Sequence, residues 1–138
     1  MRMSNQTPKP VPATHKDLAE KPLLAIVSTT LKDGTPQASP VWFNVDADGY
    51  FYFNTAQGRV KARALEAHPY ASVLIMDPAN QFRYLAVRGP VEASIEEGRA
   101  HINLLCQRYT GNPVYTFSPP TEVRIRYKLS PQHVLANG

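Results

Sequence analysis

Two Asp-Gly pairs, at 33–34 and 48–49, constrain the fold of this chain more strongly than any other feature. The pairs separate runs of residues that favour strands: an aliphatic run at 23–31, a second run at 37–45 and an aromatic run at 50–54. Asp-Gly is typical of tight hairpin turns, because glycine tolerates a positive φ and aspartate bonds to its own backbone. The spacing therefore predicts three consecutive antiparallel strands joined as a meander.

The rest of the sequence adds further strands and a few helices. The pattern predicts strands at 71–76, 83–93, 122–129 and 132–136, and helices at 16–21, from the turn after 58 to 67, and at 95–109. In the run at 122–129 apolar and charged residues alternate, so Arg124 and Arg126 are expected on the solvent side. About six strands and a few peripheral helices predict a mainly β, antiparallel, small barrel.

Three local features refine these boundaries. Pro40 cannot donate to a strand ladder, which indicates an edge strand or a bulge. Gly89-Pro90 suggests a bulge within the long strand. Ser94 is the expected N-cap of the last helix, with Glu97 at the capping-box position.

Length and charge limit the possible classes of protein. The 138 residues fit one domain, and we expect a flexible N-terminal arm at 1–17 before a single domain at 18–138. The net charge of +4 is compatible with an anionic ligand but gives little support for nucleic-acid binding, which usually needs a clustered basic face.

Membrane, disulfide and metal-binding classes find no support in the sequence. No apolar run approaches the roughly 20 residues of a membrane span, and the first residues lack a signal-peptide core, so the expected location is cytoplasmic. Cys106 is the only cysteine, which excludes an intrachain disulfide. The four histidines have no ligand spacing, so no metal site is expected.

A cationic turn lies between the aromatic run and the helix that follows it. It comprises Thr55, Gln57 and Gly58, where the strand must turn into the helix, and then Arg59, Lys61 and Arg63. Backbone N–H groups at a helix start, with cationic side chains beside them, bind anions. We expect Arg59 to belong still to the loop, because Arg59 and Lys61 point apart on an ideal helix. A solvated helix face is the simpler alternative, but the turn favours a phosphate clamp for a flavin-like cofactor.

Several segments share their order and spacing with a known family. They are ASPVWF at 38–43, FNTAQGRVKAR at 53–63, DPANQFRY at 77–84, VRGPV at 87–91 and RYTG at 108–111. Together they resemble the pyridoxamine 5′-phosphate oxidase-like superfamily, and within it the deazaflavin (coenzyme F-420)-dependent oxidoreductases. The resemblance implies a split β-barrel, a homodimer with cofactor sites at the subunit interface, and hydride transfer through the deazaflavin ring to a small conjugated or quinone-like molecule.

The same resemblance implies roles for individual residues. It places the cofactor phosphate on Arg59 and Lys61, with Arg63 nearby, and includes Gln57 and Gly58 of the turn. The remaining residues would meet the ring and the chain that joins it to the phosphate. They are Ser39, Pro40 and Val41 along one side of the ring, Asn54 and Thr55 at the ribityl chain or ring edge, and Met76 and Tyr84 from the other side or the partner subunit. No catalytic residue is assigned, which fits a cofactor that carries the chemistry itself.

Two alternatives keep the same fold. An FMN-dependent oxidoreductase would use the same clamp, because both cofactors present a phosphate. A non-catalytic protein that binds a flavin or a tetrapyrrole such as haem would share the pocket and lack turnover. The sequence does not identify the substrate.

Overall fold

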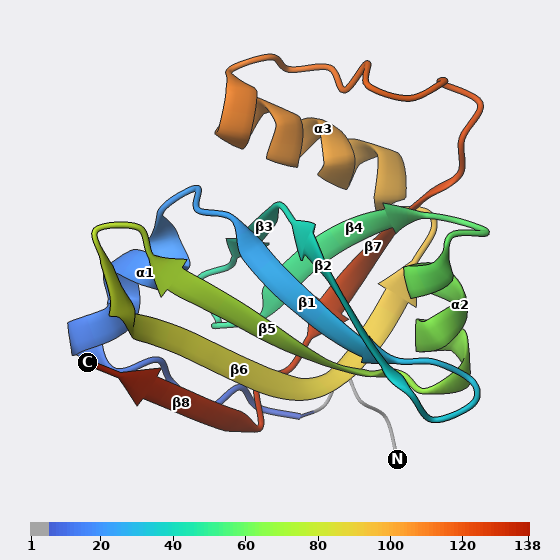
Figure 1. Ribbon diagram of the computed structural model, residues 1–138. Coiled ribbons are helices and arrows are strands. Elements are labelled where there is room, and N and C mark those ends of the chain that lie inside the picture. The colour runs from blue at the N-terminus through green and yellow to red at the C-terminus, as the bar shows by residue number, and fades with distance from the viewer. Residues whose placement is uncertain (1–5) are drawn as a thin grey trace.

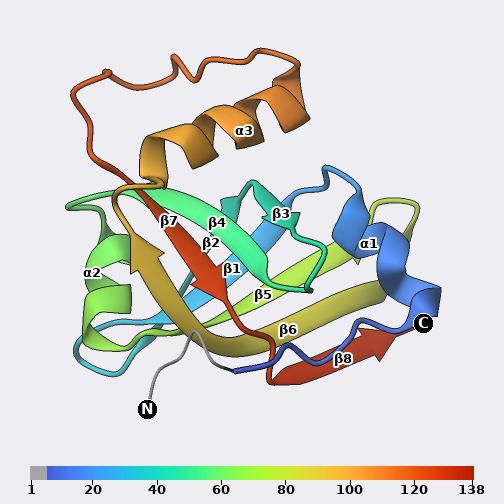
Figure 2. The same cartoon turned by 180° about the vertical axis from the view of Figure 1, so that it is seen from behind.

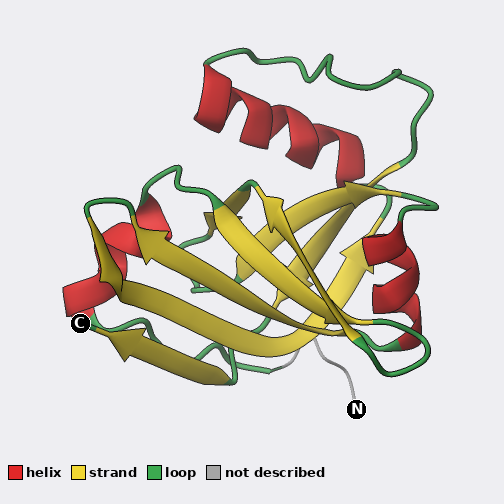
Figure 3. Ribbon diagram, in the orientation of Figure 1, coloured by secondary structure: helices red, strands yellow, loops and turns green. Residues whose placement is uncertain are grey.

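The computed structural model of the protein describes residues 6–138, so the first five residues of the predicted N-terminal arm lie outside the described part. Figure 1 shows a curled sheet with helices at its periphery, and Figure 3 separates helices, strands and loops by colour. The elements are η2 (Ala13–His15), α1 (Lys16–Glu20), β1 (Ala25–Thr30), β2 (Pro36–Val41), β3 (Phe43–Val45), β4 (Phe51–Ala56), α2 (Val60–Ala67), β5 (Tyr70–Asp77), β6 (Asn80–Ser94), α3 (Gly98–Thr110), β7 (Arg124–Leu129) and β8 (His133–Asn137).

The two edge strands of the curled sheet follow each other in the sequence. Its strand order is β2-β1-β5-β6-β7-β4-β3, and β8 pairs with β6 beside this path. All pairs are antiparallel. Because β2 and β3 are separated only by Trp42 yet lie at opposite ends of the order, the sheet closes on itself (Figures 1 and 2). The architecture is the split β-barrel with peripheral helices that the sequence predicted.

The predicted meander is present with one change. The run at 37–45 forms two strands instead of one: β2 pairs with β1, whereas β3 pairs with β4. Both predicted hairpin turns are present, with Gly34 at φ 89° and Gly49 at φ 93°. Pro40 lies in β2, the terminal strand of the order, as expected for an edge residue.

The bulge predicted at Gly89-Pro90 is wrong. The register between β5 and β6 runs without a shift through Ala71↔Gly89, and the irregularity lies instead between Met76 and Asp77. Glycine is required at 89 for another reason: a Cβ there would lie 1.9 Å from the carbonyl oxygen of Ser130. At this point β6 changes partner, from β8 to β7.

The start of α3 also differs from the prediction. The helix begins at Gly98 and not at 95, and the hydrogen bond from the Glu97 N–H to Ser94 Oγ (3.2 Å) closes a turn before it. Gly98 lies against β7, where a Cβ would approach the Arg124 carbonyl oxygen to 1.9 Å. The close contact brings α3 onto β7 and β4, where Ile102 and Leu105 become buried (Figure 1).

The core fills the inside of the curled sheet. Its largest fully buried side chains include three aromatic residues of β3 and β4 and aliphatic residues of the other strands; they are Phe43, Phe51, Phe53, Val27, Val73, Ile75, Leu85, Val87 and Leu129. Leu18 of α1 joins this core. In α2 the buried residues are Ala62, Ala64 and Leu65, whereas Val60 is exposed. No helix within residues 6–138 has the length and apolar character needed to cross a bilayer.

Candidate functional site

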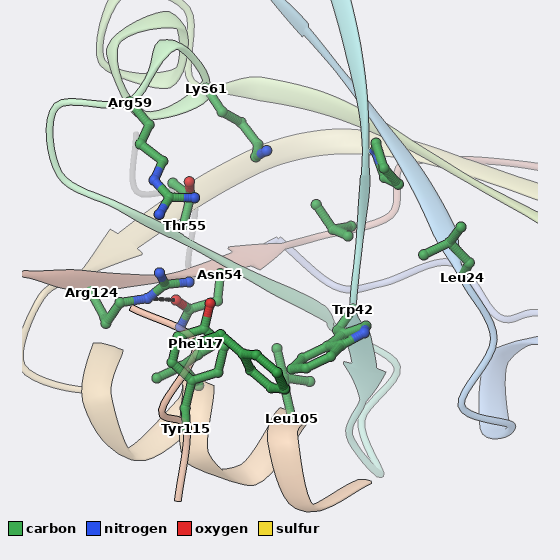
Figure 4. Close-up of a pocket in the computed structure, with 13 residues that line it drawn as sticks. Leu24, Trp42, Asn54, Thr55, Arg59, Lys61, Leu105, Tyr115, Phe117 and Arg124 are labelled. Atoms are coloured by element: carbon green, nitrogen blue, oxygen red, sulfur yellow. Dashed lines mark hydrogen bonds between the residues drawn. The ribbon is translucent and has the colours of Figure 1, made fainter. Parts of the chain in front are cut away.

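A pocket of about 330 Å³ opens between the start of α2, strands β2 and β4, and the loop that follows α3 (Figure 4). Six of the residues predicted for a cofactor site line it: Pro40, Val41, Asn54, Thr55, Arg59 and Lys61. The size is within the range of small-molecule sites. One end of the pocket is cationic and the other is aromatic, and the two ends are built from different segments.

The cationic end depends on how β4 passes into α2. β4 ends at Ala56, Gly58 adopts φ 89°, and Arg59 has an extended backbone (φ −74°, ψ 159°) as the N-cap of the helix. Arg59 therefore belongs to the loop, as expected, and both Arg59 and Lys61 line the pocket (Figure 4). Burial lowers the pKa of Lys61, and the charges of Arg59 and Arg124 lower it further.

Ser39 does not line the pocket, but its side chain contacts a residue that does. Lys61 Nζ donates a hydrogen bond to Ser39 Oγ at 2.8 Å. The bond joins the first turn of α2 to the edge strand β2 and holds the ammonium group between them.

Glu122 joins two of the cations. Its Oε2 accepts from Arg59 Nη2 at 2.9 Å and its Oε1 accepts from Arg124 Nη1 at 2.7 Å. Burial alone would raise the pKa of Glu122, but hydrogen bonds from Ser118, Arg124 and Arg59 outweigh it and lower the pKa to about 2. Together with Lys61, the two arginines make three cations at this end of the pocket. Glu122 is the one carboxylate that pairs with them, so the four side chains carry a net charge of +2.

Arg124 is buried, which contradicts the prediction that it faces solvent. Its side chain is 4% exposed, because α3 and the loop after it cover this face of β7. Arg124 Nε donates to Asn54 Oδ1 at 2.9 Å, and its guanidinium lies 5.1 Å from the ring centre of Tyr115. The alternation of apolar and charged residues at 122–129 correctly predicted a strand. It did not predict the burial of Arg124, because both faces of β7 are covered at the end where this residue lies.

A hydrogen-bond network behind Arg124 fixes Asn54. Asn54 Nδ2 lies 3.0 Å from the Gly98 carbonyl oxygen and 3.0 Å from His101 Nδ1. His101 Nε2 lies 2.7 Å from Asn44 Oδ1. Burial, and then the charges of Arg126 and Arg124, lower the pKa of His101 to about 3, so the ring is neutral near pH 7. Asn54 then donates to Nδ1, and Nε2–H donates to Asn44.

The other end of the pocket is an aromatic wall (Figure 4). Trp42 stacks on Tyr109 with ring centres 5.2 Å apart and an angle of 14°. Tyr115 and Phe117 each meet Trp42 edge-on at 6.2 Å. Leu24 from the segment before β1, with Ile102 and Leu105 from α3, completes the apolar lining. A flat apolar group is the chemistry that such a wall accommodates.

The other predicted site residues lie away from this pocket. Gln57 and Gly58 form the turn before α2 and do not line it, and Arg63 lines a separate hollow that includes Lys32. Met76 and Tyr84 are opposite each other on β5 and β6, on the outer face of the sheet. Met76 is 48% exposed there.

The aromatic wall and Arg124 were not predicted as site residues. Trp42 directly follows Ser39, Pro40 and Val41, which were predicted to line the ring. This position in the sequence was the one signal that could have identified it as a site residue. Tyr115 and Phe117 lie in an irregular loop without periodicity, and no local pattern distinguishes them. Within residues 6–138 no group of His, Cys, Asp and Glu side chains could hold a metal ion.

Comparison with known proteins identifies the family. The sequence profile described as pyridoxamine 5′-phosphate oxidase matches residues 11–136, which is nearly the whole chain. The chain belongs to the pyridoxamine 5′-phosphate oxidase family. No curated protein matches its sequence at a significant level.

Solved structures agree with membership of this family. An F-420 reductase is 31% identical, with a TM-score of 0.79 over 91% of this chain and 98% of that one. A protein of unknown function from Agrobacterium tumefaciens is 20% identical, with a TM-score of 0.75 over 91% of this chain and 55% of that one. A conserved hypothetical protein from Mycobacterium tuberculosis is 20% identical, with a TM-score of 0.72 over 95% of this chain and 86% of that one. The last two similarities support the fold alone.

Proposed function

We propose that this family member is an oxidoreductase that binds the deazaflavin coenzyme F-420 and reduces a small conjugated or quinone-like molecule. The observation that carries the proposal is the two-ended pocket, with Arg59 and Lys61 at one end and an aromatic wall around Trp42 at the other. A cofactor with a phosphate and a flat ring has the matching chemistry. The 31% identity to an F-420 reductase supports the choice of cofactor.

In this proposal the protein binds and orients, and the cofactor supplies hydride chemistry when it is bound. Lys61 and Arg59 hold the phosphate. Pro40 and Val41 of the edge strand face the ring, and Trp42 and Phe117 exclude water from it. Thr55, at the end of β4, lies between the two ends of the pocket and meets the linking chain (Figure 4).

A homodimer is part of the proposal. Several apolar side chains lie on the outer face of β1 and β5, including Ile26, Leu74 and Met76, which share a hollow. A second copy of the chain packed on this face would cover them and would bring Met76 and Tyr84 toward a shared cofactor site.

FMN is the second candidate, because the cationic end favours a phosphate without selecting the ring attached to it. A non-catalytic flavin- or tetrapyrrole-binding protein is the third; no catalytic acid or base has been assigned to the pocket, which is compatible with a carrier. Turnover separates the carrier from both enzymes.

The test is a titration of the purified protein with FMN and with oxidised and reduced coenzyme F-420, followed by fluorescence. The proposal expects the deazaflavin to bind at least about tenfold more tightly than FMN, a difference of about 1.4 kcal/mol. Reduced cofactor must then be oxidised in the presence of a quinone acceptor. Tighter binding of FMN would favour the second candidate, and binding without oxidation by any acceptor would favour the third.

A further inference from the structure

Arg124 has hydrogen-bonding capacity that the described chain does not use. Nε donates to Asn54 and Nη1 donates to Glu122, but within residues 6–138 no acceptor lies within hydrogen-bond distance of Nη2. The side chain is 4% exposed and lines the pocket (Figure 4). The fully buried side-chain atoms without a partner in this part of the chain are Thr29 Oγ1, Gln37 Oε1 and Arg126 Nε, so Arg124 Nη2 is accessible from the pocket. An oxygen acceptor bound in the pocket would receive a charge-assisted hydrogen bond from it.

The position of Arg124 identifies the kind of acceptor. Arg124 and Arg59 bind the two oxygens of one carboxylate, Glu122, so their guanidinium groups converge on the same region. The charge of Arg124 also acts on Lys61, which lies at the same end of the pocket. The net charge of +2 favours a phosphate over a neutral group: the phosphodiester of coenzyme F-420 carries about −1, and the phosphomonoester of FMN carries about −1.5 to −2 near neutral pH. A ring carbonyl would leave most of that charge uncompensated.

We propose that Arg124 is the third cation of the phosphate site and donates through Nη2 to a phosphate oxygen, while Asn54 and His101 are positioning residues that fix its guanidinium. This inference rests on the proposed function and names a residue that the sequence pattern placed outside the site. Arg63, which the resemblance placed near the phosphate, lines a different hollow.

The positioning role follows from the donors and acceptors of the network. Asn54 must present its oxygen to Arg124 and its amide nitrogen to Gly98 and His101. A side chain at 101 without an acceptor leaves one of the Asn54 N–H groups unpaired. Asn54 then loses its fixed orientation, and Arg124 loses the side-chain amide oxygen that accepts from its Nε. Glutamine at 101 offers an acceptor for Asn54 and a donor for Asn44, whereas phenylalanine offers neither.

The first experiment uses the unmodified protein and inorganic phosphate as the probe. Arginine Nε–H signals are followed by NMR, and Arg124→Lys assigns the signal of Arg124. We expect the Arg124 and Arg59 signals to shift together and to saturate at the same phosphate concentration. A shift of Arg59 with no change at Arg124 would overturn the proposal. Because this measurement needs no substituted protein, poor folding of a variant does not affect it.

The second experiment compares FMN with riboflavin, which lacks the phosphate. Arg124→Gln should weaken FMN binding about 10- to 100-fold, the effect of one charge-assisted hydrogen bond, and leave riboflavin binding unchanged. Equal weakening of both ligands would assign Arg124 to the ring and contradict the proposal. Arg88→Gln, which removes an exposed arginine of β6 outside the pocket, is the matched control.

The positioning residues are tested by the same comparison. His101→Phe should weaken FMN binding and leave riboflavin binding unchanged, whereas His101→Gln should bind FMN more tightly than His101→Phe does. Equal FMN binding by the two variants would reject the positioning role.

The proposed function can fail while the phosphate site stands. If phosphate shifts Arg124 but neither FMN nor coenzyme F-420 binds, the phosphate site stands and the oxidoreductase does not.

Discussion

Lys61 Nζ lies 2.8 Å from Ser39 Oγ, and this hydrogen bond joins α2 to the edge strand of the barrel. The two residues are 22 positions apart in the sequence. The β4–α2 turn supplies the cations, while β2 supplies the adjoining side of the pocket. A ligand phosphate that binds Lys61 therefore contacts a group that both segments hold in place.

Loss of the two cations of the turn should weaken binding of a phosphorylated cofactor. We expect Lys61→Ala to cost about 1.5–3 kcal/mol, the range for a hydrogen bond to a charged group, and Arg59→Ala to cost less because its side chain is 53% exposed. A fluorescence titration of the single and double variants measures both effects. Unchanged affinity in the double variant would reject the phosphate clamp.

Replacement of Glu122 should have the opposite effect. Glu122→Gln removes the carboxylate that pairs with Arg59 and Arg124, so the pocket gains one unit of positive charge. We expect inorganic phosphate to bind roughly tenfold more tightly at low salt, with a smaller gain at 0.15 M or above because screening reduces the added attraction. Weaker phosphate binding would mean that Glu122 serves chiefly to hold the arginines in position. Isothermal titration at two salt concentrations distinguishes these outcomes.

The fold was predictable from the sequence to a greater extent than the site. Hairpin turns and alternation are local signals, so they identified the strands and the cationic turn at Arg59. The burial of Arg124 was not predictable, because it depends on α3 folding back over β7, a contact between segments that the sequence separates by the long loop 111–123. Phe117 entered the site for the same reason: a loop residue has no periodicity, and only the path of the chain places it beside Trp42.

His101 should make the folded state sensitive to acid. Its pKa is about 3 in the folded protein and 6.5 in its unperturbed state, so between these pH values the unfolded chain binds a proton that the folded chain does not. The free energy of unfolding should therefore fall as pH decreases from 6.5 toward 3, by up to about 1.4 kcal/mol per pH unit from this group. Urea unfolding of the protein and of His101→Gln at several pH values measures the difference. Parallel curves for the two proteins would contradict the prediction.

Gly98 should be intolerant of any side chain. A Cβ at this position would lie 1.9 Å from the Arg124 carbonyl oxygen and 2.9 Å from the Ile125 nitrogen, both of which are backbone atoms. We expect Gly98→Ala to lower the free energy of unfolding by about 1–3 kcal/mol or more, because α3 must move away from β7. Gly111→Ala is the control: nothing lies within 4 Å of its Cβ, although its φ of 84° carries a local strain of its own. Urea unfolding should show the larger loss for Gly98→Ala.

Phe117 offers a test of the aromatic wall that leaves the core intact. Its side chain is 69% exposed and contacts Trp42 and Tyr115 edge-on, so Phe117→Ala should change the free energy of unfolding by less than about 1 kcal/mol. A flat ring bound against Trp42 would lose one aromatic neighbour, at a cost of about 0.5–1.5 kcal/mol. Riboflavin, which presents the ring without the phosphate, should therefore bind more weakly, and inorganic phosphate should bind as before. Val114→Ala, in the same loop but outside the pocket lining, is the matched control. Weakened phosphate binding with unchanged riboflavin binding would place the ring elsewhere and assign the loop to the cationic end.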